Sequence, residues 1–183
     1  MSDVWSPIYY PYRQRTEFAV LAEARVHLHA GTELEWLVAA LGDPERKRFV
    51  VAILLKDKSL PEILFDPLIR AAVNEPDVKF NRAFVAPCVR AFGLKRTAEA
   101  LLRIFETGSN SEKVRAANAL DWATEPGEVE TRRRCAFLEE FVRNEDLAVR
   151  RSLAGRVDLD PANYPADRKP LVDEAIRIAK SPA

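Results

Sequence analysis

Residues 101–123 read LLRIFETGSNSEKVRAANALDWA, and this stretch decides the fold class. An apolar run through Phe105 ends at Gly108, a Gly/Ser/Asn turn follows, and a second run carries small residues at helical spacing. Apolar residues that recur every three to four positions indicate amphipathic helices, while glycine and serine mark where one helix stops and the next begins. The stretch therefore predicts two antiparallel helices joined by a short turn.

Similar units recur on both sides of this stretch. Thr32 with Glu35 is expected to form a capping box, Asn144 to cap a late helix, and Pro67 to kink or split its helix near Asp66. The predicted helices cover, in chain order, about 16–31, 33–42, 44–55, 59–73, 78–92, 95–107, 111–122, 128–143, 145–155 and 168–180.

A column of small residues appears when the second helix of each pair is aligned. The column contains Ala52, Ala83, Ala117 and Ser152, at spacings of 31, 34 and 35 residues, and it follows the apolar column Phe49, Phe80, Val114 and Val149. Helix-pair repeats have periods of this size. Small residues let two backbones approach closely, so the column predicts where one pair packs on the next.

These residues carry a family resemblance. FETGSNSEKVRAANALDWA and FVRNEDLAVRRSLAGRV resemble the second half of a HEAT repeat, with Val114-Arg115 and Val149-Arg150 at matching places, and PEILFDPLIRAAV is similar to its proline-containing first helix. The resemblance covers residues 32–157. It implies an all-α superhelix of about five stacked antiparallel helix pairs, a HEAT-like solenoid over residues 15–183 with a capping helix at 168–180. The motif names no activity, because fold and function are separable.

Residues 1–14 form a different kind of segment. Pro7 and Pro11 disfavour helix in WSPIYYPYR, which predicts an extended arm rich in aromatic side chains. The arm either covers the apolar end of the first helix pair, as stacked repeats require, or recognises a partner, or is a disordered tail.

Composition excludes several classes of protein. The apolar and charged fractions, 48% and 31%, are those of a soluble globular chain, and 28 basic residues balance 28 acidic ones. Cys88 and Cys135 lack CxxC spacing and are expected to be free thiols. No run approaches the 18 apolar residues of a membrane span, so a cytoplasmic location and no membrane partner are expected. No catalytic, cofactor or metal signature appears; His27 and His29 lie two residues apart on a helix and cannot share a metal.

Function is expected on the concave face, which the second helices line in HEAT-like solenoids. Candidate binding residues there are Arg48, Lys79, Arg82, Arg115, Trp122, Arg150 and Arg151. The first hypothesis is a scaffold that binds a protein or peptide. The alternative is nucleic-acid binding or DNA repair in a basic groove. Some HEAT-like alkylpurine glycosylases use aromatic residues and an Asp to hold damaged bases, and Asp121-Trp122 offers this pair of residue types. Against a binding role, Arg115 and Arg150 would pair with carboxylates of adjacent repeats, and Trp122 would belong to the core.

Overall fold

The protein is all-α throughout the part of the chain that the structure describes. The computed structural model describes residues 19–27, 31–51, 59–124 and 126–180. Every regular element in these ranges is a helix, and no strand occurs among them, which confirms the predicted all-α class. The arm predicted over residues 1–14 lies outside the described residues.

The chain divides into two compact units, and the first comprises residues 1–67. Its described elements are a helical segment at 19–27, α2 (Glu33–Gly42), α3 (Lys47–Phe49) and the 3-10 turn η2 (Glu62–Leu64). The helix α2 packs against α3 and η2. It buries Trp36, Leu37, Ala40 and Leu41, which recur at helical spacing along one face.

The predicted capping box at the start of α2 is wrong. The Thr32 side chain makes no capping bond to the helix; its hydroxyl instead hydrogen-bonds to Nδ1 of His27, 2.8 Å away. The His27 ring also stacks on Trp36, with 6.0 Å between ring centroids. A nearby imidazole therefore takes the hydroxyl that a capping box would use.

The second unit comprises residues 68–183 and holds most of the helices. They are α5 (Asn81–Phe92), α6 (Leu94–Thr107), α7 (Asn110–Leu120), α8 (Glu128–Arg143), α9 (Leu147–Leu153) and α10 (Lys169–Lys180), with 3-10 turns η3 (Pro161–Asn163) and η4 (Ala166–Arg168) before α10. The boundary between the units falls inside α4 (Phe65–Val73). Pro67 lies in the first turn of α4, directly after η2, so the expected helix is split just before the proline.

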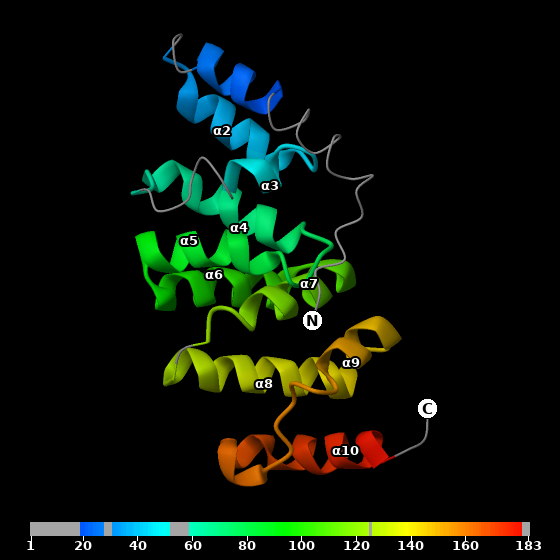
Figure 1. The fold of residues 1–183 in the computed structure, drawn as a ribbon. Helices are drawn as coiled ribbons and strands as arrows, with labels where there is room; N and C mark the ends of the chain where they lie inside the picture. Colours follow the sequence, from blue (N-terminus) through cyan, green and yellow to red (C-terminus); the bar gives the residue numbers. More distant parts are fainter. Residues whose placement is uncertain (1–18, 28–30, 52–58, 125, 181–183) are drawn as a thin grey trace, which may run out of the picture. The chain divides into compact units, whose positions relative to one another are not determined.

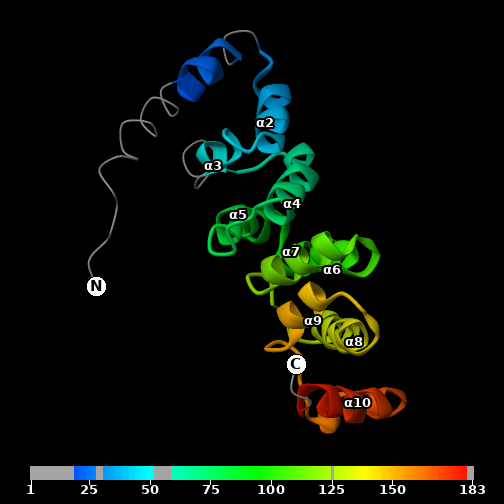
Figure 2. The ribbon, with the colours of Figure 1, turned by 90° about the vertical axis from the view of Figure 1, so that its right-hand side faces the viewer.

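Helices pack against their sequence neighbours or against the next helix but one in this unit. The helix α6 packs against both α5 and α7, and α8 packs against both α9 and α10. Figure 1 shows these helices following one another in layers, from α5 to α7, then α8 with α9, then α10. Figure 2 looks nearly along the axis of α8 and shows α9 beside it.

The core of this unit comes from amphipathic faces. In α6, Ala98, Leu101, Leu102 and Phe105 recur at helical spacing and are buried. The Phe105 ring meets Phe137 of α8, with 4.7 Å between centroids and 53° between planes. Aromatic pairs prefer such tilted arrangements, so this contact ties the α6–α7 pair to the α8–α9 pair.

The turn between α6 and α7 is built as its sequence predicts. Ser109 caps α7 in a complete capping box with Glu112, and a Cβ at Gly108 would lie 2.6 Å from the Ile104 carbonyl oxygen. Only glycine fits there without displacing backbone. The next cap differs from prediction: Asp146, not Asn144, caps α9 through the N–H groups of its first turn, and Asn144 ends α8.

The alignment of small residues requires a correction. Ala117 is completely buried, whereas Ala83 and Ser152 are only half-buried, so the three do not occupy equivalent packing positions. Aligning the three helices by their completely buried residues instead matches Phe84 of α5 with Ala116 of α7 and Val149 of α9, at spacings of 32 and 33 residues. A buried residue therefore recurs at these spacings, but its side chain varies in size.

Side chains join α7 and α9 start to start and end to end, which shows that the two helices run parallel. At their starts, Nδ2 of Asn110 donates to Oδ2 of Asp146 over 3.1 Å. At their ends, Arg156 donates to both carboxylate oxygens of Asp121 and, over 3.0 Å, to Oδ1 of Asn118. The helices α7 and α9 therefore lie side by side and point in the same direction.

Candidate functional site

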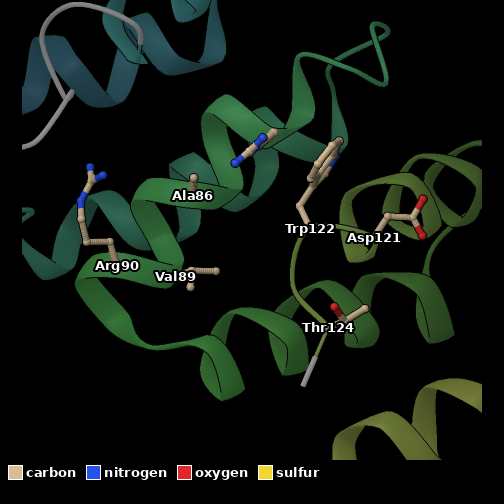
Figure 3. Close-up of a pocket in the computed structure, with 7 residues that line it drawn as sticks. Ala86, Val89, Arg90, Asp121, Trp122 and Thr124 are labelled. Atoms are coloured by element: carbon tan, nitrogen blue, oxygen red, sulfur yellow. The ribbon is translucent and has the colours of Figure 1, made fainter. Parts of the chain in front are cut away.

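A pocket opens between α5 and the segment that follows α7, both within the second unit. Its volume is about 410 Å³, and it is lined by Arg82, Ala86, Val89, Arg90, Asp121, Trp122 and Thr124. Figure 3 shows Ala86, Val89 and Arg90 on one wall and Trp122 and Thr124 on the other. One second helix of the predicted repeat, α5, and the turn that follows another, α7, therefore contribute to one depression.

The α5 wall follows from helical periodicity. Arg82, Ala86 and Arg90 recur every four residues and are exposed, while Phe84, Val85 and Cys88 are buried on the opposite face. Residues four apart lie one above the other on a helix. Ala86 therefore separates two long side chains, and its small size leaves the space that forms the pocket.

The exposure of Trp122 contradicts the alternative prediction that this residue belongs to the core. The helix α7 ends at Leu120, Trp122 lies in the following turn, and its indole is 39% exposed. The next residue, Ala123, is buried instead. The guanidinium carbon of Arg82 lies 5.4 Å from the centroid of the Trp122 ring system, within range for a cation–π contact. An exposed aromatic ring is thus held against a cationic side chain at the pocket wall.

Asp121, the neighbour of Trp122, is engaged on the side away from the indole. Arg156 donates from Nη2 to Oδ2 over 2.7 Å and from Nε to Oδ1 over 3.1 Å. The carboxylate points away from the Trp122 ring (Figure 3). An Asp that acts as a general base must reach the reacting group. In this arrangement Asp121 instead joins α7 to the end of α9.

Of the seven predicted binding residues, the structure brings Arg82 and Trp122 together. Arg48 is exposed on α3 of the first unit, and Lys79 is exposed in the turn before α5. Arg115 is half-buried on α7 and donates to the Ser111 hydroxyl; Arg151 is exposed on α9.

Arg150 holds the end of a neighbouring helix. Its side chain donates to the carbonyl oxygens of Val142 and Asn144, at the end of α8. A cation at a helix C-terminus satisfies carbonyls that have no partner within the helix. The predicted pairing of basic side chains with carboxylates of adjacent helices is made by other residues, in the ion pairs Lys113–Glu140, Arg132–Glu106 and Arg156–Asp121.

The two cysteine thiols are not activated as nucleophiles. Burial raises the pKa of the Cys88 thiol to about 12, which disfavours the nucleophilic thiolate, and burial also raises the pKa of Cys135. A second depression of about 320 Å³ beside Cys135 is lined largely by side chains of the ion pairs just named and by Arg168. Within the described ranges, no three His, Cys, Asp or Glu side chains are grouped so that they could hold a metal ion.

The described helices also include no candidate for crossing a bilayer, since none is both long and apolar enough.

Sequence reasoning missed the apolar part of the pocket, namely Ala86 and Val89. The available signal was the spacing of Arg82, Ala86 and Arg90, which places a small residue between two long ones on one helical face. Comparison with protein-family models, with curated proteins and with solved structures finds no match.

Proposed function

We propose that the chain is a HEAT-like α-solenoid of about five helix pairs that binds an acidic segment of a partner protein on the face formed by its second helices. The exposed Trp122 beside Arg82, in a pocket between the second helix α5 and the turn after α7, carries this proposal.

The solenoid part of the proposal is supported by the geometry of the second unit. The helices α7 and α9 are parallel and joined at both ends, as equivalent helices of stacked repeats are. Burial repeats from α5 to α7 to α9 with a period near that of known helix-pair repeats. The HEAT-like turns after Phe105 and Phe141 point to the same architecture.

The binding part is supported by the charge of the second-helix face. Arg82, Arg115 and Arg151 lie on α5, α7 and α9 and are exposed or half-exposed. Asp121 on the same face is already engaged by Arg156. A face with a basic excess attracts acidic segments and steers their approach. An exposed aromatic ring adds the apolar contact that protein interfaces favour at their centre.

Selection of random peptides on the full chain tests the proposal. We expect enriched peptides to be acidic and to lose about tenfold or more in affinity with the charge-reversal variant Arg115→Glu/Arg151→Glu. Arg103→Glu, which reverses an exposed charge on the first helix α6, is the matched control and should bind as the wild type does. Failure to enrich any peptide, or equal loss with the control, would contradict the proposed face.

Nucleic-acid binding is the second candidate, favoured by the same pairing of arginines with an exposed Trp122. Phosphate contacts make affinity fall steeply with salt concentration, so a single strand should bind tightly at low ionic strength if this function is correct. The glycosylase version has less support, because both oxygens of the Asp121 carboxylate accept hydrogen bonds from Arg156. Absence of binding to single or double strands at low salt would eliminate this candidate.

A further inference from the structure

We infer that the pocket between α5 and Trp122 receives an aromatic side chain that is flanked by carboxylates in the bound segment. This inference rests on the proposed function and names the chemistry that the site would read. The shape of the pocket, its apolar surface and its charge each contribute independently.

The shape follows from one small side chain. Ala86 lies between Arg82 and Arg90 on the exposed stripe of α5 and lines the pocket, so the helix presents a single methyl group there. A volume of about 410 Å³ is within the range of small-ligand sites, roughly 300–1,000 Å³. One large side chain of a partner can enter such a space, whereas a folded element cannot.

The apolar surface favours an aromatic occupant. Trp122 presents an indole that is 39% exposed, and Val89 and Ala86 supply aliphatic carbon on the facing wall. Aromatic rings pair with tilted or offset geometry and gain about 0.5–1.5 kcal/mol beyond the burial of area. The Arg82 guanidinium already lies over the indole, so a second ring would pack on a side chain that has a contact before the ligand arrives.

The charge favours carboxylates beside that ring. The lining includes two guanidinium groups, on Arg82 and Arg90, and one carboxylate, on Asp121. Arg156 engages Asp121 from outside the pocket, so the carboxylate is compensated before any ligand arrives. Guanidinium groups bind carboxylates through paired N–H donors. A segment with acidic residues beside an aromatic residue would match the Arg82 guanidinium, which lies next to the indole.

Three short peptides separate the features of the ligand. We would titrate Ac-EEFEE-NH2, Ac-EEAEE-NH2 and Ac-KKFKK-NH2 into the full chain and follow binding by calorimetry and by tryptophan fluorescence. We expect the first to bind at least about tenfold more tightly than either of the others, a difference of about 1.4 kcal/mol. Binding of Ac-EEFEE-NH2 should also change the fluorescence of wild-type protein but not that of Trp122→Phe.

A pocket-filling variant tests the location. Ala86→Leu adds bulk at an exposed helical position and should remove the tenfold preference for phenylalanine over alanine while leaving thermal stability unchanged. Ala148→Leu, the same change at an exposed position of α9 outside the pocket, is the matched control and should keep the preference.

The outcomes distinguish the inference from the function on which it rests. Equal affinity for Ac-EEFEE-NH2 and Ac-EEAEE-NH2, or a preference that survives Ala86→Leu, would overturn the inference while the acidic-peptide function stands. Binding of neither acidic peptide, together with a peptide selection that enriches nothing acidic, would overturn both. Tighter binding of Ac-KKFKK-NH2 would overturn the assigned charge and with it the proposed face.

Discussion

Replacement of Ala117 by leucine should destabilise the protein through overpacking. Ala117 is completely buried in α7, a helix that packs against both α6 and α9, so the added carbons have no solvent into which they can turn. Extra methylenes in a packed core cost about 1–3 kcal/mol. For a chain of this length, each kcal/mol lowers the thermal midpoint by about 2–4 °C, so a decrease of about 2–12 °C is expected.

Ala83→Leu is the matched control because Ala83 is only half-buried on α5. Its free energy of unfolding should stay within about 0.5 kcal/mol of the wild type. Urea unfolding followed by circular dichroism measures both variants. Equal destabilisation by the two changes would restore the alignment that equates Ala83 with Ala117, and an unaffected Ala117→Leu protein would refute tight packing around α7.

Three further predictions concern other parts of the second unit. Phe105→Ala removes one ring of the buried Phe105–Phe137 pair and should cost about 3–5 kcal/mol in urea unfolding, whereas a loss under 1 kcal/mol would contradict a close-packed contact. The Ala148 N–H holds the pKa of Asp146 below its usual value. The Asp146 carboxylate therefore stabilises the fold at pH values above the unfolded pKa of about 3.9, and this contribution is lost as pH falls through the native pKa. The difference in thermal midpoint between wild type and Asp146→Asn should shrink from pH 7 to pH 3. N-ethylmaleimide at neutral pH should leave Cys88 unmodified until urea unfolds the chain, because burial raises the pKa of Cys88 to about 12; rapid labelling of Cys88 in the native protein would show that the helix opens readily.

The helices were predictable because their signals are local. Glycine at 108, serine at 109 and glutamate at 112 define one turn by their own backbone and side-chain chemistry, and the structure contains that capping box. The capping box at Thr32 could not be predicted in the same way, because its hydroxyl is taken by His27, a side chain of the preceding helical segment.

The site was predictable only in part. Charge and aromatic content identified Arg82 and Trp122 as candidates, but the exposure of Trp122 depends on α7 ending at Leu120 and on Ala123, not Trp122, turning into the core. The pocket depends on the small size of Ala86, which lies between Arg82 and Arg90 on α5. The sequence alone does not show that another part of the chain faces this position, so it could not indicate a pocket there. Tertiary neighbours, not local propensity, therefore determine the site.

The two side-chain connections between α7 and α9 have a mechanical consequence. A single connection would act as a hinge about which one helix could swing, but attachment at both ends, through Asn110 and through Asp121, blocks rotation about either point. We therefore expect a shift of α9 relative to the rest of the unit to be accompanied by a shift of α7 and of the turn that carries Trp122.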